Sequence, residues 1–151
     1  MNQTANARQV AGNHYASADG IQHWDLIDEY NVGYLEGCAS KYVTRWRKKD
    51  GLVALEKAAH FMQKLYERRS AETFSQVIKR MPGVPLKVIS RFAAANGLNA
   101  DEERILGHIL AWQSTGTIDL ARREIEALHA ANAGHGDDGA EASIGYVNQD
   151  R

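Results

Sequence analysis

Apolar residues recur at helical spacing through residues 34–69, and the pattern is interrupted only at Asp50 and Gly51. Positions three or four apart are apolar on both sides of this break: Leu35, Cys38, Tyr42 and Trp46 before it, and Leu55, Ala59, Met62 and Tyr66 after it. Such spacing gives each helix one apolar face, and so short a link returns the second helix antiparallel to the first. The sequence therefore predicts a helical hairpin, with helices at 34–49 and 52–69.

The same periodicity predicts helices at 21–30, 86–95, 100–113 and 117–131, with a weaker helical segment at 71–79. The helix at 100–113 has the clearest start, because Asn99 can cap it and three acidic residues follow in its first turn. We therefore expect an all-α protein, a compact bundle of about six helices arranged as antiparallel hairpins.

Four parts are expected along the chain. Residues 1–20 are polar and without sustained periodicity, which predicts a mobile arm, and residues 132–151 have the composition of a disordered tail. Between them lie a helical region at 21–70 and a second one at 71–131. Both prolines of the chain fall in the stretch 81–85, which favours a boundary between subregions there.

Composition indicates the cellular compartment in which the protein works. The chain has 44% hydrophobic and 25% charged residues, as ordinary globular proteins do. A single cysteine, Cys38, excludes an intrachain disulfide, and no apolar run has the length of a signal peptide or a membrane span. These features favour a cytoplasmic protein with no membrane contact.

Charge is distributed unevenly, although the net charge is only -1. Residues 41–69 contain nine basic and three acidic residues, a net charge of +6, whereas residues 101–151 contain four basic and ten acidic residues, a net charge of -6. Opposed charges of this kind suit head-to-tail packing of identical subunits. We therefore expect a homo-oligomer, with the functional site near a subunit interface because one short hairpin makes only a shallow pocket.

The basic residues of the hairpin fall on two ridges. Lys41, Arg45 and Lys48 share one ridge with Gly37, whose missing side chain would let a phosphate approach the backbone. The second ridge, on the following helix, carries Lys57, His60 and Lys64. If the ridges converge, they form a pocket for several phosphate oxygens. The alternative is that these side chains only solvate the outer face of the hairpin.

No familiar phosphate-binding or hydrolytic motif accompanies the ridges: GxxxxGK[ST], GxGxxG, HExxH and the nucleophile elbow are all absent. Asp25 and Asp28 lie one turn apart on the same side of a helix and are a weak candidate magnesium site, with solvated helix acids as the alternative. Trp24, Tyr42 and Trp46 are either core residues or surfaces on which a base can stack.

An ordered set of residues between positions 13 and 65 matches a recurring pattern: an initial His-Tyr, a later aromatic residue followed by Asp, a Gly-Asn-Ala-x-Lys-Tyr-x-x-Arg helix and a Leu-x-Lys-Ala helix. The matching residues are His14, Tyr15, Trp24, Asp25, Gly37, Ala39, Lys41, Tyr42, Arg45, Lys49, Leu55, Lys57, Ala58 and His60. In this pattern the segment resembles the SaV-like family of small phage proteins. It departs from the family at Cys38, where the family has Asn.

The resemblance implies a function. The family includes a coliphage enzyme that phosphorylates deoxynucleoside monophosphates without a P-loop, so a phosphotransferase that uses ATP and Mg²⁺ is expected. Catalytic roles would fall on Lys41 and Arg45, which would neutralise the transferred group, and on Asp25, which would hold magnesium or orient the acceptor. Nucleotide or phosphate contacts would come from His14, Tyr15, Trp24, Gly37, Lys49, Lys57 and His60.

Two other functions fit the same basic hairpin. A non-catalytic protein that binds or sequesters a small nucleotide, as in phage counter-defence, needs the pocket but no metal-binding carboxylate. An adaptor for nucleic acid or protein would instead use the hairpin as an open face, and its affinity would be spread over many Lys and Arg residues.

Overall fold

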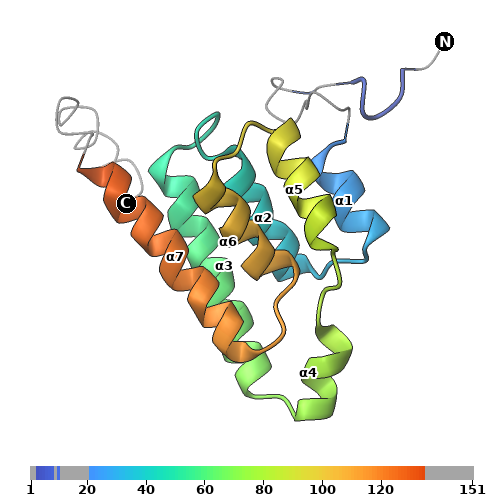
Figure 1. Cartoon of the computed structure of the whole chain (residues 1–151), viewed down its shortest axis with the longest axis vertical. Coiled ribbons are helices and arrows are strands. Elements are labelled where there is room, and N and C mark those ends of the chain that lie inside the picture. The colour runs from blue at the N-terminus through green and yellow to red at the C-terminus, as the bar shows by residue number, and fades with distance from the viewer. Residues whose placement is uncertain (1–2, 9, 11–20, 135–151) are drawn as a thin grey trace.

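The computed structural model describes residues 3–8, 10 and 21–134, and in this part of the chain it contains seven helices and no strand (Figure 1). The helices are α1 (His23–Glu29), α2 (Tyr34–Arg45), α3 (Leu52–Ser70), α4 (Phe74–Arg80), α5 (Leu86–Ala95), α6 (Ala100–Leu110) and α7 (Thr115–Ala133). The all-α fold is confirmed. The count of about six is one short because the weak segment at 71–79 forms the complete helix α4.

The structure describes only part of the expected arm and tail. Of the arm at 1–20 it describes residues 3–8 and 10, and of the tail at 132–151 it describes residues 132–134. Where the two overlap at the C-terminal end, α7 continues to Ala133, two residues beyond its predicted end.

The α2–α3 hairpin forms as predicted, but α2 ends at Arg45 rather than at residue 49. Residues 46–50 form turns in which the backbone N–H of Lys49 still donates to the Arg45 carbonyl and that of Gly51 donates to the Trp46 carbonyl. Asp50 and Gly51 both have positive φ, at 69° and 56°. Two successive residues with positive φ reverse the chain, which Asp and Gly tolerate better than most residues.

The core draws buried residues from α1, α2, α3, α5, α6 and α7. Its longest helices, α3 and α7, run antiparallel side by side along much of their length (Figure 1). Small residues at this contact are fully buried, among them Ala54 and Ala58 of α3 and Ala121 of α7. Larger apolar side chains fill the space on either side, such as Met62 and Ile125. Small residues let two helix backbones approach closely, so this pair forms a rigid support for α2 and α6, which pack against it.

Glu102 of α6 joins that helix to the turn after α2. It completes the capping box with Asn99, whose Oδ1 accepts from the Glu102 backbone N–H at 2.9 Å. Its carboxylate also accepts from Trp46 Nε1 at 3.3 Å and forms an ion pair with Arg47. Glu102 is fully buried, so this acid is a structural anchor as well as a first-turn residue.

The α4 helix lies at one end of the bundle, beyond the end of α3 (Figure 1). A capping box formed by Thr73 and Gln76 specifies its start, but none of its residues is buried and Phe74 is 81% exposed. Local capping therefore accounts for this helix better than packing does. Among the described helices, none is long and apolar enough to cross a membrane.

Candidate functional site

Three cations from the two helices of the hairpin surround the ring of Tyr42. Lys41 Nζ and Arg45 Cζ each lie 4.9 Å from the ring centroid, and Lys57 Nζ of α3 lies 5.6 Å from it. The Tyr42 ring also stacks on Phe61, with 6.0 Å between the ring centroids. Cations within about 6 Å of an aromatic centroid are attracted to the ring, which offsets part of their mutual repulsion. We call Tyr42 and these three cations the Tyr42 cluster.

Arg45 is the most fixed member of the cluster. It is only 8% exposed, and its Nη2 lies 3.6 Å from Asp50 Oδ2. The turn that reverses the chain after α2 therefore also supplies the counter-ion of this guanidinium. A buried, ion-paired arginine presents its charge in a defined position.

A pocket of about 350 Å³ opens between α1 and α2, next to the cluster. Its lining residues are His23, Trp24, Ile27, Asp28, Asn31, Val32, Gly33, Tyr34, Gly37, Cys38 and Lys41. Binding pockets for small molecules have volumes of roughly 300–1,000 Å³, so this one is large enough for a small ligand. Lys41 belongs to both the pocket and the Tyr42 cluster. We call it the α1–α2 pocket.

His23 is a pocket residue that the sequence reasoning did not select. Its Nε2 lies 2.8 Å from Ser40 Oγ, which in turn donates to the Gly37 carbonyl at 3.1 Å. Burial, together with the positive charges of Lys41 and Arg45, lowers the pKa of His23 from 6.5 to about 4. The imidazole is therefore neutral near pH 7. The signal for it in the sequence was its spacing of four from Ile27, which places both on the face of α1 toward α2.

Two exposed aromatic side chains line the same pocket. Trp24 is 52% exposed and its Nε1 donates to Asn6 Oδ1 at 2.8 Å, whereas Tyr34 is 76% exposed and meets Phe61 edge to face. Trp24 is thus not a core residue, and that alternative is wrong. Trp46, by contrast, is buried in the core. Exposed aromatic rings beside a pocket offer faces on which a base can stack.

Cys38 also lines the pocket, at the position where the SaV-like pattern has Asn. It is partly buried and lies one turn after Tyr34 on α2. Interaction with the thiol raises the pKa of the Tyr34 hydroxyl. Cys38 and Tyr34 thus line the same pocket side by side.

Gly37 has a different role from the one expected. A Cβ atom at this position would lie 3.5 Å from Ile27 Cγ2, at ordinary van der Waals distance. Hence the space next to Gly37 is filled by α1, and the expected approach of a phosphate to this backbone is not supported on the side that faces Ile27. Gly37 lines the pocket where α2 meets Ile27 of α1.

The two candidate metal ligands of α1 separate in the structure. Asp25 Oδ2 accepts from the backbone N–H of Gln22 at 3.0 Å and from Asn6 Nδ2 at 2.8 Å, so it serves as the capping carboxylate of the helix. Asp28 is exposed and lines the α1–α2 pocket. Magnesium is commonly held by one or two carboxylates together with substrate phosphates, and Asp28 fits that role better than Asp25. Within the described ranges, no group of three or more His, Cys, Asp or Glu side chains is arranged to hold a metal ion.

The other predicted residues do not join this site. Lys49 is exposed in the turn after α2. His60 is exposed and lines a separate pocket of about 250 Å³ with Glu126 and His129 of α7. The predictions for His14 and Tyr15 lie outside the described residues. The structure thus brings together Trp24, Asp28, Gly37, Lys41, Arg45 and Lys57, around Tyr42 and the pocket beside it.

No protein-family model, curated protein or solved structure matches this chain. The resemblance to the SaV-like family therefore rests on the motif residues between positions 13 and 65 alone.

Proposed function

We propose that the protein is a phage-type nucleotide-handling enzyme that transfers the γ-phosphoryl group of ATP to a deoxynucleoside monophosphate in the cytoplasm. The observation that carries the binding part of this proposal is the convergence of Lys41, Arg45 and Lys57 on Tyr42, beside the α1–α2 pocket. The resemblance to the SaV-like family supports the choice of reaction.

Each part of the acceptor has a matching group in this region. The base would stack on the exposed rings of Trp24 or Tyr34, and the phosphate would face Lys41. Neutral His23 would offer a hydrogen bond without adding charge. Arg45 acts close to the pocket, because its charge contributes to the low pKa of His23.

In the proposed reaction, an oxygen of the acceptor monophosphate attacks the γ-phosphorus of ATP. The bond from that phosphorus to the β–γ bridging oxygen breaks, and ADP leaves with the bond electrons. The cations of the Tyr42 cluster would stabilise the charge on the transferred group, which is the main task of a protein in phosphoryl transfer. Magnesium supplies charge neutralisation at the phosphates when bound, and Asp28 would help to hold it.

The direct test is incubation of the purified protein with ATP, Mg²⁺ and each deoxynucleoside monophosphate, with the diphosphate product measured by chromatography. We expect one or more of the four to be phosphorylated. Lys41→Ala should lower kcat/KM by roughly 100-fold, as expected for removal of a group that stabilises transition-state charge. Lys49→Ala is the matched control, because Lys49 lies outside the pocket and the cluster. If none of the four acceptors is converted to its diphosphate, this reaction is ruled out.

One observation favours the alternative of a non-catalytic nucleotide binder. Asp25, the acid expected to take part in catalysis, is engaged in capping α1. The two functions differ in a calorimetric titration combined with the turnover assay. Tight binding of a nucleotide without turnover would identify a binder, whereas turnover that falls in Asp28→Asn while binding is retained would identify the enzyme.

A further inference from the structure

We propose that a second pocket, beside α4, binds the polyphosphate chain of a nucleoside triphosphate. It has a volume of about 600 Å³ and is bounded by the start of α2, the last turns of α3 and the end of α4. Five of its lining residues are basic: Lys64, Arg68, Arg69, Lys79 and Arg80. We call it the α4 pocket. This inference rests on the proposed function, for which it supplies the donor site.

The basic residues of the α4 pocket outnumber the acidic residues that face them. Glu72 pairs with Arg69 Nη1 at 3.2 Å and lies 3.9 Å from Arg80 Nε. Lys64, Arg68 and Lys79 have no ion-pair partner in the part of the chain that the structure describes. Unpaired cations around one cavity repel each other, and a bound polyanion relieves that repulsion.

Glu36 is the only acidic residue that lines the pocket. It is buried, and burial raises its pKa, while the charges of Arg69 and Arg80 act in the opposite direction. A Cβ atom at Gly33 would lie 2.6 Å from Glu36 Oε2, so the carboxylate is folded back against the N-cap. Glu36 thus offsets part of the charge of Arg69 and Arg80, and Lys64, Arg68 and Lys79 remain without an ion pair among the described residues.

Cations at helix C-termini have a simpler explanation in general, because they interact favourably with the helix dipole. That explanation covers the sequence positions of Arg68, Arg69, Lys79 and Arg80, which lie in the last turns of α3 and α4. It does not cover Lys64, which precedes the last turn. The helix dipole explains the position of Arg69 in the sequence but not its surroundings. The Arg69 side chain is more than nine-tenths buried, yet its Nε has no hydrogen-bond partner within the described residues.

The location of the α4 pocket suits a phosphate donor. It shares Asn31, Gly33 and Tyr34 with the α1–α2 pocket, so the two are neighbours across the start of α2. Phosphoryl transfer requires donor and acceptor phosphates to meet in line. The cations also line one cavity. In proteins that bind single-stranded nucleic acid, cations follow a long open groove instead. The arrangement here therefore favours a compact polyphosphate.

Calorimetric titration of the full chain with inorganic tripolyphosphate and with ATP tests this proposal. We expect both to bind, and Arg68→Ala and Lys79→Ala each to weaken their binding by roughly 5-fold or more, as loss of a charge-assisted contact does. Lys87→Ala is the charge-matched control, because Lys87 is exposed on α5 and lines neither pocket. Thermal melting of each variant checks that the fold is intact.

Deoxynucleoside monophosphate binding separates this inference from the proposed function. Lys79→Ala should leave that affinity unchanged within about 2-fold, and Lys41→Ala should weaken it without changing tripolyphosphate binding. If tripolyphosphate binds and monophosphates do not, the α4 site stands and the acceptor site fails. Tripolyphosphate affinity that is the same in Arg68→Ala, Lys79→Ala and wild type would overturn the inference. Tighter binding of a single-stranded oligonucleotide, lost in the same variants, would also overturn it.

Discussion

His23 is held neutral by two features that the structure places around it. Burial disfavours the charged imidazole, and the positive charges of Lys41 and Arg45 disfavour it further. The Nε2 atom also lies 2.8 Å from Ser40 Oγ. Because the Ser40 hydroxyl donates its hydrogen to the Gly37 carbonyl, the Nε2–H of His23 is the donor to Ser40 Oγ. A protonated His23 would add a third cation where two already repel it.

Stability should therefore fall on acidification through the range set by His23. Its pKa is about 4 in the folded protein and 6.5 when unfolded, so the unfolded state binds more protons between these values. The contribution is complete above pH 6.5 and is lost as the pH falls toward 4. We expect His23→Gln, which keeps a donor for Ser40, to have a shallower fall in melting temperature between pH 7 and pH 4.5.

The pH dependence of stability also contains a contribution from Glu36, whose raised pKa acts in the opposite direction to the lowered pKa of His23. Its contribution to stability is lost as the pH rises through its folded pKa, so it opposes the trend from His23 in the wild type. The difference between wild type and His23→Gln cancels this term. Parallel melting curves of the two proteins across this pH range would contradict the account of His23.

At the scale of elements, Gly37 lies where α1 packs on α2. Because a Cβ at Gly37 would make an ordinary contact with Ile27, Gly37→Ala should fit. It should also raise the free energy of unfolding by about 0.5–1 kcal/mol, since glycine is the weaker helix former. Urea unfolding measures this change. The affinity for a deoxynucleoside monophosphate should change less than about 2-fold, and a loss of tenfold or more would show that a phosphate does contact this backbone.

Glu102 connects α6 to the turn that follows α2. Glu102→Ala removes an acceptor from buried Trp46 Nε1 and a counter-ion from Arg47, and we expect it to lower the free energy of unfolding by about 3 kcal/mol. Asp101→Ala is the matched control in the same helical turn. Asp101 is exposed and its ion pair with Arg104 lies at the surface, so the cost should be below about 1 kcal/mol. Equal losses in the two variants, measured by urea unfolding, would refute the role of Glu102 as an anchor.

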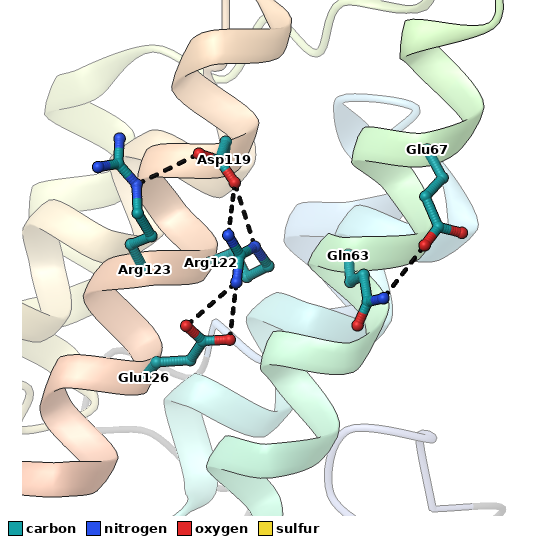
Figure 2. A network of polar contacts seen from close by, with 6 residues as sticks. All are labelled: Gln63, Glu67, Asp119, Arg122, Arg123 and Glu126. Atoms are coloured by element: carbon teal, nitrogen blue, oxygen red, sulfur yellow. Dashed lines mark hydrogen bonds and ion pairs between the residues drawn. The ribbon is translucent and has the colours of Figure 1, made fainter.

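At the scale of the whole molecule, the acidic residues of α7 form ion pairs with neighbouring arginines. Figure 2 shows Arg122 bonded to both Asp119 and Glu126 within α7, with Arg123 bonded to Asp119 from the other side. Glu124 is likewise paired with Arg104 of α6. The net charge of -6 already counts these arginines, so the pairs order the acids of α7 without changing the net charge of this half.

Exposed apolar surface is a second feature that supports the proposal of a homo-oligomer. Phe74 is 81% exposed on α4, and Ile78 is exposed one turn later on the same helix. Light scattering coupled to size-exclusion chromatography should give a mass above that of the 16.7 kDa chain at micromolar concentration. Phe74→Ser should lower that mass, because exposed apolar surface drives subunit association. A monomeric wild type under these conditions would contradict the expectation.

The fold was largely predictable because each helix carries its own local signals. The apolar stripe of the hairpin predicted α2 and α3, and Asn99 correctly predicted the start of α6. The early end of α2 was missed, because Trp46 continues the helical spacing although the turn uses it as a core residue. The site was predictable only in part. Ridge geometry placed Lys57 beside Lys41, but no local signal revealed that His60 faces α7.

The central claim is that a small nucleotide binds beside the Tyr42 cluster, and a calorimetric titration with deoxynucleoside monophosphates tests it most directly. The account predicts saturable binding of one or more of them to the wild-type chain. It also predicts that affinity falls by roughly 10-fold or more in Lys41→Ala, as loss of a charge-assisted hydrogen bond implies, and is unchanged in Lys49→Ala. Absence of binding to the wild type, or equal losses in the two variants, would contradict it.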